Sequence, residues 1–159
     1  MGSRGFSLVE LMIVMLVVGI VLAAGLPAYS RFRDDMLVGE ARAQLLQDLR
    51  VARQTAVTWH CPVIIAFGNG STTTNVSGYT VHMDTNANGS FDSGERRFSR
   101  TMPSRTLLAT VALQPTDSLV FDLSGVLRLG TAGGSMILVT PRGQRDTLFV
   151  SAAGVTYAP

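Results

Sequence analysis

The stretch DTNANGSFDSGE, residues 84–95, places side-chain oxygens at the spacing of a calcium-binding loop. The pattern D-x-[DN]-x-[DN]-G-x5-E is met by Asp84, Asn86, Asn88, Gly89 and Glu95, with Ser90 and Asp92 at its seventh and ninth places. This spacing wraps oxygen ligands around Ca²⁺, although only three carboxylates are present, so any such site should be weak. The alternative, which we favour, is a plain turn without a cofactor, because Asp, Asn and Gly tolerate left-handed backbone and close Asx-turns.

The histidines and the cysteine do not form a recognisable catalytic or metal site. His60 and His82 lie in different segments without metal-ligand spacing, and no serine occupies a G-x-S-x-G elbow. Cys61 follows His60 directly, but adjacent residues of an extended chain point to opposite faces. As the sole cysteine, Cys61 cannot form an internal disulfide, and we expect a small buried apolar group. The sequence therefore predicts that the protein is not an enzyme.

A glutamate interrupts the apolar segment near the N-terminus. From Leu11 to Ser30 the chain carries no charged side chain, a length that suits a helix crossing the hydrocarbon core of about 30 Å. Glu10 stands at the edge of this run. An ionised carboxylate at the centre of a membrane-spanning helix costs about 2.5 to 3.5 kcal/mol. Glu10 is thus a functional candidate that needs a partner. The alternative is a glutamate that reaches the headgroups from a helix end.

The basic residues are all arginines, and the formal net charge of +2 is too small to indicate a nucleic-acid-binding protein by itself. Arg96, Arg97, Arg100 and Arg105 cluster after the acidic loop, and Arg142 with Arg145 flank a later turn. A surface that follows phosphates is one interpretation. A solvated arginine face is the other, and we favour it.

These residues must be positioned by one long helix and a β-rich head. Apolar residues recur at steps of three and four along the second half of the helix, which is typical of an amphipathic helix with one face in a core. They are Leu37, Ala41, Leu45, Leu49, Ala52 and Ala56, whereas Arg42, Asp48, Arg50 and Arg53 fall mostly elsewhere. The helix should run from about Phe6 to Val57, with Pro27 inviting a break.

Beyond the helix, short apolar or alternating runs separated by Gly-rich turns predict strands. They are VIIAFG, GYTVHMD, RRFSR, LLATVAL, SLVFDLSG, VLRLG, SMILVTP, DTLFVSAAG and VTYAP, with turns that include TAGG and PRGQ. The predicted fold class is α+β. Residues 6–30 form a transmembrane or filament-core half of the helix and residues 31–58 its amphipathic half. This helix packs on a mostly antiparallel β-sheet or small β-sandwich in a head of residues 59–159.

The segment RGFSLVELMIVMLVVGIVLAAGLPAY resembles the class III signal of type IV pilins and type II secretion pseudopilins. The resemblance implies that residues 1–5 are a leader, that a prepilin peptidase cuts between Gly5 and Phe6, and that the new amine of Phe6 is methylated. Glu10 then becomes the fifth residue of the mature chain, where this family carries its glutamate. In a bundle of parallel helices, the carboxylate of Glu10 can meet the amine of a neighbouring Phe6, and a buried charge is tolerable when it is paired.

The head resembles the GspH/FimT group of minor pilins and pseudopilins, through the loop at residues 84–95, FDLSGVLR and LFVSAAGV. This resemblance implies a minor subunit at the initiation point or tip of a type IV pilus or type II secretion pseudopilus. It would cross the bacterial inner membrane once, with its head in the periplasm or on an extracellular filament tip. The implied partners are other pilin or pseudopilin subunits, the prepilin peptidase, the inner-membrane assembly platform and membrane lipid.

Two alternative functions stay open at this point. A DNA-uptake minor pilin is one, but DNA-binding relatives lead us to look for an arginine-bearing tail, and this chain reads SAAGVTYAP there. We therefore expect no DNA partner, with Arg142 and Arg145 as the candidate contacts otherwise. A membrane-anchored periplasmic binding domain is the other alternative.

Overall fold

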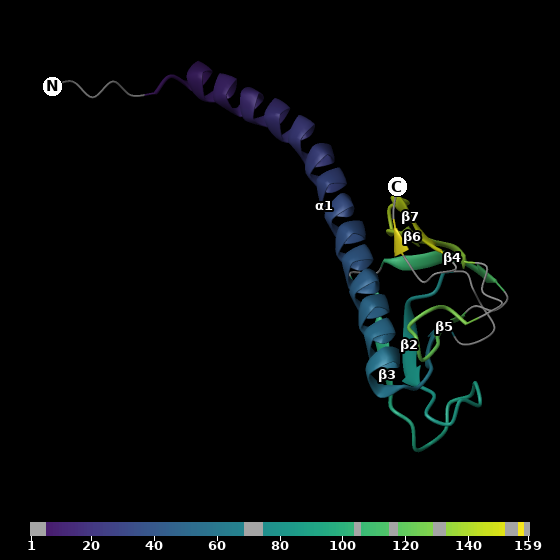
Figure 1. Ribbon diagram of the computed structural model, residues 1–159. Helices are drawn as coiled ribbons and strands as arrows, with labels where there is room; N and C mark the ends of the chain where they lie inside the picture. The colour runs from purple at the N-terminus through teal and green to yellow at the C-terminus, as the bar shows by residue number, and fades with distance from the viewer. Residues whose placement is uncertain are drawn as a thin grey trace. The chain divides into compact units, whose positions relative to one another are not determined.

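The computed structural model describes residues 6–68, 75–103, 106–114, 118–128, 133–151 and 156–157, and within them one helix is followed by eight strands (Figure 1). The chain divides into two compact units, residues 1–35 and 36–159. The predicted leader, with Gly5, lies outside the described residues.

Helix α1 spans Leu8–Trp59, within two residues of the predicted range. Pro27 lies inside the helix, so the break that it invites does not end the helical backbone. Proline has no N–H to donate to the carbonyl one turn earlier, which usually costs about 3 kcal/mol inside a helix. The hydroxyl of Ser30 donates to the carbonyl of Pro27 at 2.9 Å.

The C-terminal part of α1 buries one stripe of small and branched side chains. Most of the predicted stripe is confirmed, but Leu37 is half-buried and Val38 takes the buried place at its start. The buried members are Val38, Ala41, Leu45, Leu49, Ala52 and Ala56. Asp48 was expected away from the core, yet it is buried too.

The first sheet contains four antiparallel strands in the order β3-β2-β1-β5. Their bounds are β1 Val63–Phe67, β2 Gly78–Met83, β3 Arg97–Thr101 and β5 Ser118–Phe121. β1 is buried along most of its length, whereas every residue of β3 is exposed. Since β3 lies at one end of this order, it is an edge strand.

The second sheet is also antiparallel, in the order β4-β6-β7-β8. Its strands are β4 Leu107–Gln114, β6 Gly133–Val139, β7 Arg145–Val150 and β8 Thr156–Tyr157. The prediction of a mostly antiparallel, β-rich head is thus confirmed, while one local prediction is wrong. The glycines of TAGG belong to β6 rather than to a turn, because Gly134 passes so close to the carbonyl of Ala112 that a Cβ would collide with it. Within the described part of VLRLG, Leu127 forms an antiparallel bridge to Phe121, and the N–H of Arg128 donates to the carbonyl of Val120 at 2.8 Å.

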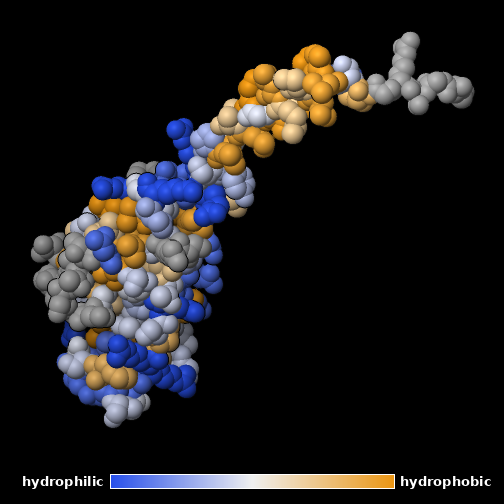
Figure 2. Space-filling model, turned by 180° about the vertical axis from the view of Figure 1, so that it is seen from behind, coloured by the Kyte–Doolittle hydropathy of each residue, from blue (hydrophilic) through white to orange (hydrophobic). Residues whose placement is uncertain are grey.

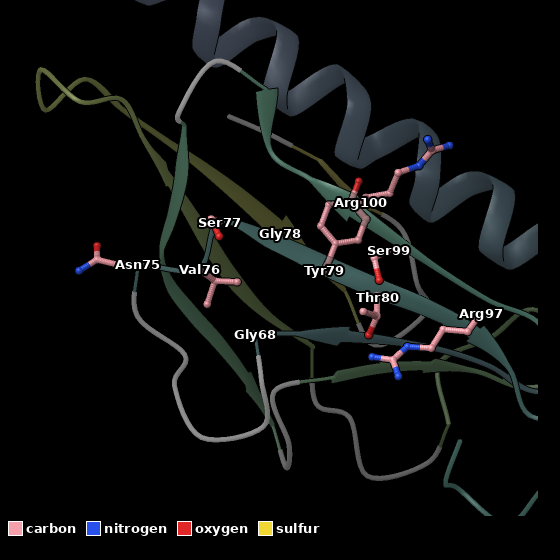
Figure 3. A pocket seen from close by; sticks show the side chains of 10 residues that line it. All are labelled: Gly68, Asn75, Val76, Ser77, Gly78, Tyr79, Thr80, Arg97, Ser99 and Arg100. Carbon is pink, nitrogen blue, oxygen red and sulfur yellow. The ribbon is translucent and has the colours of Figure 1, made fainter. Parts of the chain in front are cut away.

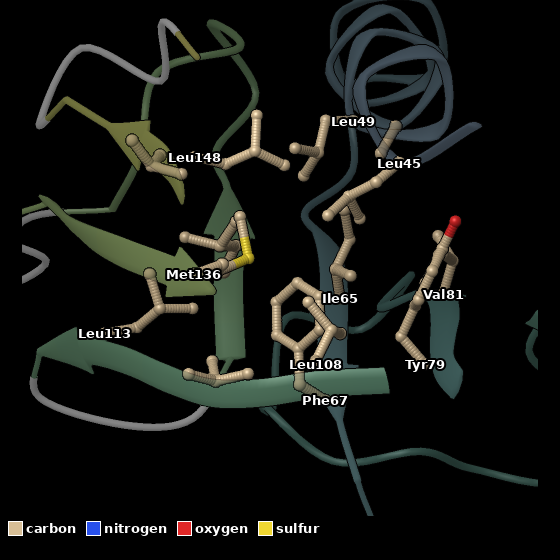
Figure 4. Packing of buried hydrophobic residues seen from close by; sticks show 14 of the residues in the cluster. Leu45, Leu49, Ile65, Phe67, Tyr79, Val81, Leu108, Leu113, Met136 and Leu148 are labelled. Carbon is tan, nitrogen blue, oxygen red and sulfur yellow. The ribbon is translucent and has the colours of Figure 1, made fainter. Parts of the chain in front are cut away.

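One hydrophobic core joins the helix to both sheets. Figure 4 shows Leu45 and Leu49 of α1 facing Ile65 of the first sheet and Leu148 of the second. These four side chains are at most 3% exposed. Full burial of one such side chain contributes about 1.5 to 3 kcal/mol. Residues 36–59 of α1 therefore belong to the head and contribute one buried stripe to its core.

Candidate functional site

The predicted calcium loop connects β2 to β3 and closes around a buried carboxylate. Asp84 is fully buried, and its two carboxylate oxygens accept hydrogen bonds from the backbone N–H of Asn88 at 3.0 Å and of Gly89 at 2.8 Å. Gly89 has a φ of 79° and Ala87 a φ of 56°, in the left-handed region where alanine is strained. Asp84, the first residue of the motif, therefore holds the backbone at the fifth and sixth positions, Asn88 and Gly89.

The other predicted ligands also meet within this loop. The side-chain amides of Asn86 and Asn88 both donate to one oxygen of Asp92, at 2.6 and 2.8 Å. The carboxylate of Glu95 accepts from the N–H of Thr85 at 2.7 Å and from the N–H of Asp92 at 3.1 Å. Ser90 contributes its N–H, which donates to the side-chain oxygen of Asn88 at 2.7 Å.

All six predicted ligands thus share one hydrogen-bonded loop, as the spacing required. These bonds also account for a stable turn without an ion. Within the described residues, no three His, Cys, Asp or Glu side chains form a group suited to a metal. Calcium binding at this loop stays a prediction.

The loop's charges affect the ionisation of nearby groups. Partial desolvation raises the pKa of Glu95, but the hydrogen bonds from Asp92 and Thr85 outweigh it, and the net shift is downward. Burial raises the pKa of the Cys61 thiol, and the carboxylates of Asp84 and Glu95 add to this effect. A thiol in such surroundings is a poor nucleophile, and Cys61 is buried as predicted.

Three arginines of the predicted cluster are exposed on and beside β3, each over an aromatic ring. Such contacts contribute about 0.5 to 1 kcal/mol at exposed sites and hold the guanidinium in place. The pairs are Arg96 over Trp59 at 5.5 Å, Arg97 over Phe91 at 5.0 Å and Arg100 over Phe98 at 5.5 Å, measured to the ring centroid. Arg105 lies outside the described residues. Arg142 and Arg145 are exposed at the turn between β6 and β7, in the other sheet.

A buried polar contact ties β3 to the helix. The hydroxyl of Tyr79 donates to a carboxylate oxygen of Asp48 at 2.7 Å, and the Nε of Arg100 lies 3.2 Å from the same oxygen. Burial raises the pKa of Tyr79, and its hydrogen bond to Asp48 raises it further. Sequence reasoning missed this contact because it assigned a charged residue to the solvent face. The missed signal is spacing, since Asp48 lies three residues after Leu45 and four before Ala52, on the buried stripe.

The N-terminal part of α1 is apolar and carries Glu10 in its first turn. Hydrophobic side chains cover this part of the helix in Figure 2. By length and composition, α1 is able to cross a membrane. Glu10 is exposed, in the first turn of the helix, where the helix dipole favours a negative charge. Phe6, the predicted new N-terminus, lies one turn before it.

The model of the family described as type II transport protein GspH matches residues 41–154, well over half of the chain. The chain belongs to the GspH family. A second model, the prokaryotic N-terminal methylation motif, matches residues 1–26 of this GspH-family protein. Among curated protein sequences, none matches it significantly.

The GspH-family chain also resembles a solved minor pilin. The crystal structure of the type IV minor pilin FimU from Pseudomonas aeruginosa matches it with a TM-score of 0.54 at 17% sequence identity. The match covers 80% of this chain and 90% of FimU. At this identity the likeness concerns the fold, and it confirms the predicted pilin-like architecture.

The GspH family and the methylation motif make this chain a minor pilin or pseudopilin. Proteins of these families are structural subunits, and the apolar N-terminal helix with its pilin-type motif indicates membrane anchoring of a soluble head. The individual roles of Gly5, Phe6 and Glu10 stay predictions.

Proposed function

We propose that this minor pilin or pseudopilin is cut between Gly5 and Phe6 by a prepilin peptidase and methylated on the new amine. The mature chain crosses the bacterial inner membrane once, with the head in the periplasm. An assembly platform then adds it to a pilus or pseudopilus at the start or tip of the filament. The observation that carries this proposal is a single carboxylate, Glu10, at the start of an apolar run, residues 11–30, that carries no charged side chain.

The role of Glu10 follows from charge pairing. After cleavage, the chain begins with a positive amine about one helical turn before Glu10. In a bundle of parallel helices, the amine of one subunit reaches the carboxylate of its neighbour when the two are suitably staggered. Pairing offsets the cost of burying both charges, whereas leaving one unpaired costs about 3 to 5 kcal/mol. Glu10 thereby favours one register of subunit packing.

Replacing Glu10 by leucine should separate anchoring from assembly. We expect Glu10→Leu to enter the membrane at least as well as the wild type, because a buried charge is removed. It should join filaments poorly, because a neighbour's amine is left unpaired. Membrane content and sheared-filament or crosslinked-complex content are measured side by side in a strain without the native copy. Glu40→Leu, at an exposed position of the same helix outside the apolar run, is the matched control and should assemble normally. Wild-type filament levels for Glu10→Leu would refute the pairing role.

Processing is tested at the cleavage site. The mature protein should begin at Phe6, and Gly5→Arg should retain the leader because the peptidase no longer accepts the bond. Mass measurement of the N-terminal peptide from membrane-extracted protein distinguishes the two forms. Intact Met1 or Gly2 in wild-type protein from cells with the peptidase would contradict the proposal.

A further inference from the structure

The edges of the two sheets differ in how they are covered. At the outer edge of β5, Arg128 donates its N–H to the carbonyl of Val120 at 2.8 Å. At the outer edge of β4, Val76 and Leu108 exchange backbone hydrogen bonds of 2.9 and 2.8 Å. Beside β3, in contrast, no described strand pairs on the side away from β2. An uncovered edge strand presents a row of backbone donors and acceptors to a further strand.

The ladder shows which residues of β3 face this open edge. Backbone hydrogen bonds join Met83 to Arg96 and Met102 to Ser77, so residues 96 and 102 direct their backbone groups toward β2. In an antiparallel pair this direction alternates, which turns the N–H and C=O groups of Arg97, Ser99 and Thr101 outward. The outward carbonyl of Thr101 already accepts a hydrogen bond from the Gln44 side chain of α1 at 3.1 Å, so the acceptors left for a partner strand are the carbonyls of Arg97 and Ser99.

A cavity lies on each face of β3. On the α1 side, a cavity of about 270 Å³ has mainly apolar walls that include Trp59, Val81, Met83 and Phe98. On the opposite face, a cavity of about 360 Å³ is lined in part by Thr80, Arg97 and Ser99 (Figure 3). Successive residues of a strand point to opposite faces. A strand added beside β3 would therefore place alternate side chains in an apolar and in a polar, basic cavity.

The positive charge at the β3 edge determines which kind of strand can pair with it. Arg96, Arg97 and Arg100 are exposed, and β3 itself contains no acidic residue. Two antiparallel copies of β3 would bring arginines close together, and like charges across a strand pair are destabilising. Asp48, which accepts a hydrogen bond from Tyr79, pairs with Arg100 and ties this end of the strand to the helix. The edge thus disfavours a second copy and favours an acidic partner.

We propose that β3 is a docking edge for an extended, acidic segment of a partner protein, which adds as a fifth strand to the first sheet. Alternate residues of the segment are apolar and enter the cavity beside Trp59 and Phe98. The residues between them are acidic and meet Arg97. The proposal concerns the head alone and does not depend on cleavage or on the place of the subunit in a filament.

The test uses the full chain in detergent micelles and a fluorescent synthetic peptide of alternating valine and glutamate. We expect saturable binding by fluorescence anisotropy and slower amide hydrogen exchange in residues 96–101. Two control peptides have the valines and glutamates in separate blocks, or lysine in place of glutamate, and both should bind at least about tenfold more weakly, a difference of about 1.4 kcal/mol.

Two pairs of variants separate strand pairing from charge. Ser99→Pro removes an outward N–H, which proline tolerates on the free side of an edge strand. It should bind the peptide at least about tenfold more weakly than Ser99→Ala, which keeps the N–H and carries the same loss of the hydroxyl. Arg97→Glu should also weaken binding, and Arg128→Glu, an equal charge change at the other edge of this sheet, should not.

Several results would overturn the proposal. Equal binding of the alternating and block peptides, or full binding to Ser99→Pro, would mean charge attraction without strand addition. Self-association abolished by Ser99→Pro would mean that a second copy occupies the edge. If Ser99→Pro fails to fold, the exchange measurement on the wild type decides, and unchanged exchange in residues 96–101 with saturating peptide refutes the docking edge.

Discussion

The two parts of α1 are both rich in apolar residues, but they differ in pattern and in burial. Between Leu11 and Leu26 the apolar side chains surround the helix, and all of them are exposed. Between Ala41 and Ala56, five of them form a stripe that is at most 3% exposed, and polar residues cover most of the remaining surface. A helix that is apolar all round suits a membrane or a bundle, and a striped helix suits one protein core. The arrangement of apolar residues, more than their number, separates the two parts.

The largest difference between the two parts of α1 should appear when one leucine in each part is replaced by alanine. Leu45→Ala should destabilise the head by about 3 kcal/mol, within the range of 2 to 5 kcal/mol for buried leucines. Leu16→Ala should leave head unfolding unchanged, because Leu16 is 63% exposed and makes no part of that core. Denaturant unfolding of the full chain in detergent, followed by near-ultraviolet circular dichroism, measures both. Equal losses would show that the two parts of the helix do not differ as described.

A second test concerns the polar contact on the striped part. Tyr79→Phe leaves the buried Asp48 without its 2.7 Å hydrogen bond, and about 1 to 3 kcal/mol of head stability should be lost. The contribution of Tyr79 to head stability depends on pH. The pKa of Tyr79 is raised on folding, so its contribution is complete below about pH 10, the ordinary tyrosine value, and is lost as the pH rises further. Between pH 8 and pH 11, a window that spans the ordinary tyrosine value of about 10, the difference in stability between wild type and Tyr79→Phe should shrink toward the alkaline end. Parallel curves would argue against the assigned cause.

The smallest effect is expected from calcium at residues 84–95. If the loop binds the ion, Ca²⁺ at about ten times its Kd adds about 1.4 kcal/mol to head stability and raises its Tm. Asp92→Asn removes one of the carboxylates and should reduce the shift, and Mg²⁺ at equal concentration is the ion control. Thermal unfolding at millimolar calcium measures the shift. No change in Tm would make the loop a turn alone.

The parts of the fold that local periodicity controls were predictable. The helix boundary, the stripe from Ala41 to Ala56 and most strands follow from spacings of three to four or of two. The described start of VLRLG pairs with β5 through Leu127 and Arg128, and its last two residues lie outside the described part of the chain. TAGG failed because Gly134 is required by a close backbone contact across the sheet, and sequence alone does not display that contact.

The candidate sites divide in the same way. The six predicted ligands from Asp84 to Glu95 share one set of hydrogen bonds because they belong to one short loop, so their spacing carried the information. The contact of Asp48 with Tyr79 joins residues far apart in the sequence, and the open edge of β3 depends on the order of strands in the sheet. Such features arise only from tertiary structure. The processing site and Glu10 rested on a motif, which the methylation-motif match supports.

The sharing of one core by the helix and the second sheet has a consequence for biosynthesis. Arg42 lies 3.5 Å from Asp146, and Leu49 shares its cluster with Leu148, so contacts of α1 span about two-thirds of the chain. A ribosome makes α1 first and β7 near the end of synthesis, and contacts of such sequence separation form late and slow folding. Until β7 emerges, the stripe on α1 is exposed to neighbouring nascent chains and is prone to aggregation. A chain truncated before β7 would therefore keep the apolar part of α1 but could not complete the core of its head. Such an unfolded head would be degraded by proteases at the membrane surface.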